Sequence, residues 1–225
     1  MTLAPRGQKG PAHRLVAAVA VALLTLLLAA CTITSDRPLI ADGEGSTPLP
    51  DAFTFVPYDS ADNGYAPSKE APVHFARQGD HYSTPGGFDL KGPIDIRFVP
   101  IADGLFLMQA SVAGEAGILY GFARYADGVL AVELTPDQTT TAALAKARVG
   151  AMPQLRKALA GLRIDTETDA ITVLNRSGLD LLVKLRSEGK LPLHAPSIAF
   201  ISLQDGDDAP ARLVPDGTHW VTAGQ

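Results

Sequence analysis

Two stretches of the chain decide its fold: residues 94–112, IDIRFVPIADGLFLMQASV, and residues 118–134, ILYGFARYADGVLAVEL. Each consists of two apolar runs joined by Ala-Asp-Gly, at 102–104 and at 126–128. An Asp-Gly pair between apolar runs is a strong hairpin signal, because glycine adopts a positive φ at no steric cost. The stretches therefore predict two successive β-hairpins. The residues expected to line either a packed core or the lumen of a barrel are Leu105, Leu107, Tyr120 and Phe122.

Shorter strand signals come before these hairpins. Residues 52–56 alternate in polarity with the period of two that is typical of a strand. Residues 73–77 and 81–83 flank Gly79-Asp80 and predict a further hairpin. The first half of the chain is therefore expected to form an antiparallel β-meander.

The second half adds helices. The sequence TPDQ at 135–138 is typical of a helix start and predicts a helix over 136–149. Pro153 is expected to begin a second helix, and Ser177 to cap a third over 178–188. Short strands are predicted at 170–174, 198–203, 212–214 and 219–222. We therefore expect an α+β fold, with the β-meander in the first half and helices with short strands in the second.

The first 30 residues have the composition of an export signal. Residues 1–14 contain three bases and no acid, and residues 15–30, LVAAVAVALLTLLLAA, carry no charge. This apolar run is shorter than the roughly 20 residues that a membrane-spanning helix needs. A basic segment, a short apolar segment and small residues at its end predict a secretory signal peptide over 1–30.

The signal ends in Leu28-Ala29-Ala30-Cys31, and Cys31 is the only cysteine of the chain. The motif resembles the lipobox of bacterial lipoproteins. This resemblance implies that Cys31 receives a diacylglyceryl group and an N-acyl chain after cleavage, and that these lipids hold the protein in the bacterial membrane. The other interpretation is an ordinary signal peptide followed by an incidental buried cysteine. We expect no cofactor other than this covalent lipid.

The residue after the cysteine bears on the location of the protein. In lipoproteins of bacteria with two membranes, an aspartate at this position commonly retains the protein at the inner membrane. Thr32 stands there instead. The resemblance thus implies a place in the cell envelope, at the outer membrane facing the periplasm rather than at the inner membrane.

The residues that follow predict a tether and one domain. Residues 32–50, TITSDRPLIADGEGSTPLP, are rich in Thr, Ser, Gly, Asp and Pro and contain no aromatic residue. We expect residues 31–50 to form a lipidated tether and residues 51–225 to form a single periplasmic domain. The alternative is that residues 38–40 pack against the domain as an edge segment.

Charge excludes one class of function. Removing residues 1–30 takes away three of the 19 Lys and Arg residues and none of the 24 Asp and Glu residues, so the net charge falls from −5 to −8. Binding of nucleic acid depends on Lys and Arg that neutralise phosphates, and an acidic chain is a poor candidate for it. A single cysteine also excludes a disulfide framework within the chain.

The bases of the mature chain are unevenly placed. The segment 138–164 contains five bases and no acid. Such a segment on an acidic body is a candidate surface for an acidic partner or for anionic head groups. The alternative is a solvated helix surface that forms salt bridges with the acidic remainder. The candidate docking residues are Lys146, Arg148, Arg156, Lys157 and Arg163.

The histidines are the natural candidates for metal or acid–base chemistry. His74, Asp80 and His81 lie on one predicted hairpin, and imidazole and carboxylate groups suit a zinc ion. The alternative is that the two histidines are partly exposed hairpin residues. The sequence contains neither an H-E-x-x-H pair nor a G-x-S-x-G nucleophile motif.

Two hypotheses of function follow. The first is a membrane-anchored envelope lipoprotein without enzymatic activity, whose domain binds a protein or a small molecule. The second is a periplasmic metal-dependent hydrolase that uses His74, Asp80 and His81.

Overall fold

The structure is a computed structural model, and it describes residues 32–85, 92–150, 152–202, 209–216 and 219–222, except for the side chains of 148–150. The strands are β1 Ile33–Ser35, β2 Ala52–Ala61, β3 Gly64–Pro67, β4 Val73–Gln78, β5 His81–Thr84, β6 Ile94–Ala102, β7 Leu105–Val112, β8 Ile118–Ala126, β9 Val129–Glu133, β10 Leu162–Asp165, β11 Ala170–Val173, β12 Ser197–Ser202, β13 Leu213–Asp216 and β14 His219–Thr222. The helices are α2 Gln138–Gly150, α3 Pro153–Leu159 and α4 Arg176–Ser187. Among these residues, no helix has the length and hydropathy that crossing a membrane requires.

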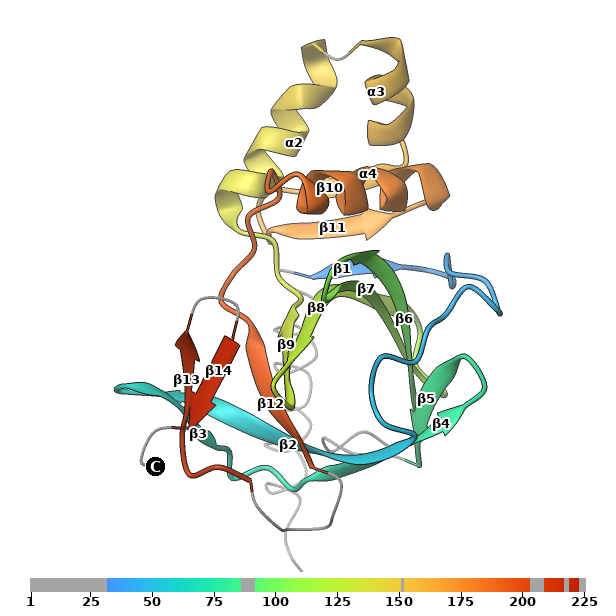
Figure 1. Ribbon diagram of the computed structural model, residues 1–225. Helices are drawn as coiled ribbons and strands as arrows, with labels where there is room; N and C mark the ends of the chain where they lie inside the picture. Colours follow the sequence, from blue (N-terminus) through green and yellow to red (C-terminus); the bar gives the residue numbers. More distant parts are fainter. Residues whose placement is uncertain (1–31, 86–91, 151, 203–208, 217–218, 223–225) are drawn as a thin grey trace, which may run out of the picture.

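Eight of the strands close into an antiparallel barrel (Figure 1). The strand order around the barrel is β2, β4, β5, β6, β7, β8, β9 and β12, and β12 returns to pair with β2. The closing register pairs Tyr58 with Ile198, so residues from both halves of the chain meet in one sheet.

The predicted α+β fold is wrong. Within the part of the chain that the structure describes, strands account for 48% and helices for 17%, and the helices lie together beyond one side of the barrel (Figure 1). The physical reason is the pairing of β12, which is hydrogen-bonded on both sides to barrel strands. The second half of the chain therefore completes the sheet of the first half instead of forming a separate α+β layer.

The predicted hairpins are confirmed. β6 pairs with β7, and β8 pairs with β9, around the two Asp-Gly turns. Gly104 and Gly128 have φ values of 62° and 75°, in the left-handed region that glycine adopts without strain. The hairpin of β4 and β5, through Gly79, is also present.

The barrel lumen is filled by side chains. Its aromatic core contains Phe53, Phe75, Tyr82 and Phe98, all at most 5% exposed, and successive ring centroids lie 5.4 to 6.1 Å apart. The four residues that the sequence assigned to a core or a lumen belong to a different cluster, on the outer face of β7 and β8 beneath the helices: Leu105, Leu107, Tyr120 and Phe122. They therefore line a packed core outside the lumen.

The helices and two short strands cover that outer face. α4 packs Leu179 and Leu182 into the same cluster, and its Asn175 cap accepts a hydrogen bond from the Gly178 amide at 3.1 Å. The cap is thus two residues before the predicted Ser177. The second helix ends at Leu159, and Leu162 begins β10.

Several of the described residues within 31–50, the segment expected to form a tether, pack on the domain. β1 pairs with both β8 and β11, and Ile40 and Leu49 are buried. We call residues 36–50 the strap. Its first part lies on the outside of β6 and β7, and Leu49 near its end packs in the aromatic core of the lumen. Its isolated apolar residues within a Pro- and Gly-rich stretch form no periodic pattern, and this is why composition alone predicts a free tether. The alternative that 38–40 packs on the domain describes the segment better.

Candidate functional site

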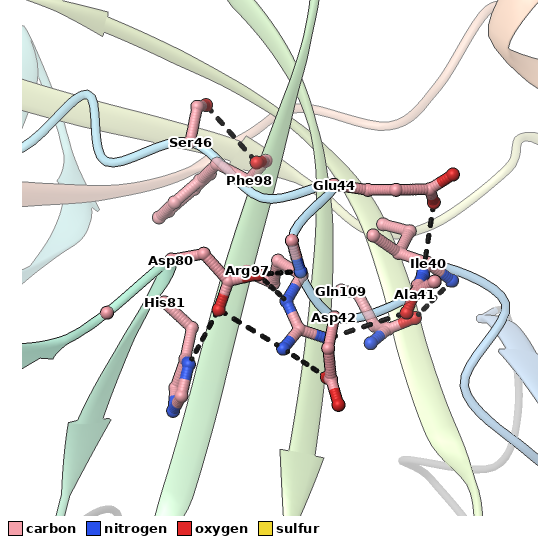
Figure 2. Close-up of polar contacts among 12 residues, drawn as sticks. Ile40, Ala41, Asp42, Glu44, Ser46, Asp80, His81, Arg97, Phe98 and Gln109 are labelled. Atoms are coloured by element: carbon pink, nitrogen blue, oxygen red, sulfur yellow. Dashed lines mark hydrogen bonds and ion pairs between the residues drawn. The ribbon is translucent and has the colours of Figure 1, made fainter.

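A row of hydrogen-bonded polar side chains lies on the outside of β5–β7. Arg97 occupies the centre of the row, with its side chain 13% exposed (Figure 2). Its Nη2 donates to Asp42 Oδ1 at 2.9 Å and to Asp80 Oδ1 at 3.4 Å. Its Nε lies 3.3 Å from Asp80 Oδ2, an ion-pair contact whose geometry falls short of a hydrogen bond. Arg97 is therefore fixed between the strap and the β4–β5 turn.

Asp80 is the acceptor that joins these groups. Besides Arg97, it accepts a hydrogen bond from the Gly43 amide at 2.7 Å, and His81 Nδ1 lies 3.1 Å from its Oδ1. The His81 hydrogen bond, followed by the Gly43 amide and the charge of Arg97, holds the pKa of Asp80 well below its usual range. The carboxylate only accepts, so the histidine hydrogen is on Nδ1 when this contact forms.

Gln109 joins the strap to the barrel on the other side of Arg97. The two residues are direct cross-strand partners, and Gln109 is 6% exposed. Its Oε1 accepts from the amides of Leu39 and Ile40 at 3.2 and 3.1 Å and from the Tyr120 hydroxyl at 2.9 Å. These bonds satisfy strap backbone groups that a free tether would leave to water.

Two further contacts hold the strap in place. At Gly45 an added Cβ would lie 2.2 Å from the Asp80 carbonyl oxygen and 2.8 Å from Arg97 Cγ, so only glycine allows this approach. On the helical side, Arg176 Nη1 donates to Glu44 Oε2 at 2.6 Å. The strap is thus fastened to both the barrel and α4.

A recess of about 260 Å³ lies beside this row. Its lining residues, contributed by the strap and by β5–β7, are Pro38, Asp42, His81, Asp95, Ile96, Arg97, Gln109 and Ser111. This volume is below the range of drug-sized ligand sites and suits a small solute. Asp95 is exposed and forms no ion pair with any described residue, whereas Arg97 is already paired. Carboxylates therefore dominate the charge around the recess.

The recess does not arrange a nucleophile and a base. In the sheet register, Ser111 lies two strands from His81 and two residues further along. Strand spacing and rise then separate the two side chains by about 12 Å, well beyond hydrogen-bond reach. Ser111 and His81 therefore do not form a nucleophile–base pair in this arrangement.

The three candidates for a metal site do not converge. Asp80 and His81 are in contact, but His74 is four residues along β4 from Gln78, the partner of His81, or about 13 Å away. His74 Nδ1 lies 2.9 Å from Thr54 Oγ1. Within the part of the chain that the structure describes, no three His, Cys, Asp or Glu residues are grouped as metal ligands.

The candidate docking residues lie away from the recess, on the helical side of the molecule. Lys146 is exposed on α2, Arg156 and Lys157 are exposed on α3, and Arg163 is exposed on β10. The side chain of Arg148 and the whole of Cys31 lie outside the described residues.

Sequence reasoning missed Arg97 and Gln109 as site residues. The available signal is a charged or amide side chain inside an otherwise apolar strand, which places that side chain on the outer face of the sheet. The partner that covers this face is the strap, and nothing in its composition indicates that it packs there.

Comparisons with known protein families, with curated proteins and with solved structures found no match for this chain.

Proposed function

We propose that the mature protein is a lipid-anchored envelope module that binds a small cationic solute, such as an aliphatic amine, in the recess on β5–β7. The anchor is the lipid on Cys31, at the outer membrane facing the periplasm. What supports the anchor is the Leu28-Ala29-Ala30-Cys31 motif, with the only cysteine at the position that the motif requires.

One observation carries the proposal for the ligand: the recess is lined by the Asp95 carboxylate, which has no ion-pair partner among the described residues, while the guanidinium of Arg97 is engaged. Side chains fill the barrel lumen, so a solute would bind on the outside. An ammonium group would pair with Asp95, and the hydroxyl of Ser111 would supply a hydrogen bond.

The ligand proposal is tested by calorimetric titration of the mature protein with 1,4-diaminobutane and with succinate, a dicarboxylate of similar length. We expect the diamine to bind, more weakly as salt is added, and succinate not to bind. Asp95→Asn should weaken diamine binding about five- to tenfold. Asp216→Asn, which removes an exposed acid of β13, serves as the control and should leave binding unchanged. Binding of succinate as tightly as the diamine, or an Asp95→Asn variant with unchanged affinity, would refute the proposal.

The anchor is tested separately. Intact-mass measurement should find the protein beginning at Cys31 with the mass of the attached acyl groups. Cys31→Ala should prevent lipidation and cleavage at this site. An unmodified Cys31 in the exported protein would show that the motif is incidental.

A further inference from the structure

Two exposed apolar residues stand three positions apart, at the N-cap and in the first turn of α3. Met152 is 77% exposed and Leu155 is 38% exposed. Met152 caps the N-terminus of α3 without a side-chain hydrogen bond, and the end of α2 and the start of α3 lie on the side of the helices that is away from the barrel (Figure 1). We call Met152, Leu155 and the nearby bases Lys146, Arg156 and Lys157 the helical tip. Large apolar side chains at a projecting tip are typical of a surface that contacts another phase or partner.

The charge of the helical tip is of one sign. Its three bases are exposed, and the sequence from 138 to 164 contains no acid. Lys146 and Lys157 form no ion pair with any described residue. These two positive charges are therefore available to an anionic surface, and the alternative of a helix surface neutralised by salt bridges is not observed for them.

Thr32, the first residue that the structure describes, lies on this same side of the molecule. The carbonyl of Thr32 accepts a hydrogen bond from the Ile171 amide at 2.9 Å, so Thr32 is fixed at the start of β11. The start of α2 lies beside it, because Thr141 Oγ1 donates to Asp169 Oδ1 at 2.7 Å. From there the 13 residues of α2 extend about 20 Å toward the helical tip. A lipid on the residue before Thr32 would hold the molecule within reach of a membrane that the tip can also touch.

We propose that the helical tip is a second membrane contact, which inserts Met152 and Leu155 at the interface of an anionic bilayer while its bases bind the head groups. Apolar residues flanked by lysine and arginine bind such interfaces, and each base near the surface adds electrostatic attraction. This inference rests on the proposed anchor, since the lipid raises the local concentration of the tip at the membrane. The two contacts together fix the orientation of the domain, because a single anchor would let it rotate.

The test uses the lipidated full protein with Met152→Cys, which carries a single free thiol once Cys31 is acylated. The thiol is labelled with an environment-sensitive dye, and the protein is reconstituted into vesicles that contain acyl-brominated lipid as a quencher. The vesicles consist of phosphatidylcholine alone or of equal parts phosphatidylcholine and phosphatidylglycerol. We expect several-fold stronger quenching in the phosphatidylglycerol vesicles, and the excess should disappear at high salt or with Lys146→Glu/Lys157→Glu. A dye on Val221→Cys, an exposed apolar position on β14, is the control and should not be quenched.

Three results would overturn the proposal: an unquenched dye at position 152 in phosphatidylglycerol vesicles, equal quenching in both vesicles, or quenching that survives the charge reversal. An unquenched dye would exclude a lipid surface as the occupant of the tip. If Cys31 proves unmodified, the anchor fails, but the tip is still tested. In that case, co-sedimentation of the chain with phosphatidylglycerol vesicles, and its loss on the double charge reversal, decides the question.

Discussion

Removing the negative charge of Asp80 should loosen the strap and lower the free energy of unfolding. The carboxylate is the common acceptor for the Gly43 amide, His81 and Arg97, at 2.7 to 3.4 Å. A hydrogen bond to a charged group contributes roughly 1.5 to 3 kcal/mol. Asparagine keeps one acceptor of similar shape, and the side chain is 25% exposed, so solvent screens part of the charge. We expect Asp80→Asn to lower the free energy of unfolding by about 2 kcal/mol at neutral pH, measured by urea unfolding of the protein.

The pH dependence of the free energy of unfolding gives a second, independent prediction for the same variant. The pKa of Asp80 is lowered in the folded protein, chiefly by His81 and then by the Gly43 amide. Its stabilising effect is therefore complete above the unfolded-state pKa of about 4 and is lost as the pH falls below that value. The difference in the free energy of unfolding between the wild type and Asp80→Asn should decrease by about 1.4 kcal/mol when the pH falls one unit below 4.

A matched control is the exposed ion pair between Asp51, just before β2, and Arg77 on β4. Asp51 and Arg77 are in contact at 3.0 Å, but their side chains are 82% and 46% exposed. Asp51→Asn should change stability by no more than about 0.5 kcal/mol. The stabilising role of the Asp80 carboxylate is refuted if Asp80→Asn lowers the free energy of unfolding no more than Asp51→Asn does. An equal effect of Asp80→Asn at pH 7 and pH 3 would refute it as well.

Three other substitutions test the strap and the helical side by the same urea unfolding measurement. Gly45→Ala should lower the free energy of unfolding by about 1 to 3 kcal/mol, because the new Cβ collides with the Asp80 backbone. Gly43→Ala is the control, since φ there is +84° but the space around it is open. A smaller effect at Gly45 than at Gly43 would contradict the contact. Gln109→Leu should cost about 2 kcal/mol, because it leaves the Ile40 amide and the Tyr120 hydroxyl without their acceptor. An unchanged free energy of unfolding would contradict this role of Gln109. Asn175→Ala should cost about 1 kcal/mol through the lost cap of α4, and an unchanged stability would contradict the cap.

The sequence predicts the local parts of this fold well. The Asp-Gly turns determine where the hairpins form, because the turn chemistry acts over four residues. The pairing of Tyr58 with Ile198 involves residues 140 positions apart, and no local pattern encodes it. The α+β prediction failed at this point, because the sequence of an apolar strand such as β12 has the same pattern at the edge of a small sheet and in a closed barrel.

The candidate site could be predicted only in part. The Asp80–His81 contact follows from adjacency in one turn, and the sequence singles out both residues. The position of Arg97 between them and Asp42 depends on the strap crossing the sheet, 55 residues away along the chain. That crossing depends on single buried residues such as Ile40, which carry no periodic signal.

The late position of β12 in the sequence determines when the barrel can close during folding. The segment that holds α2, α3 and α4 is inserted between β9 and β12, and β12 is hydrogen-bonded to both β9 and β2. A chain that has emerged only as far as residue 196 contains seven of the eight barrel strands and has two unpaired edges, each of which can pair with another molecule. Closure is a late, long-range event, and slow folding and exposure to aggregation follow from it. A chaperone that covered these edges until β12 was available would protect the protein during its synthesis.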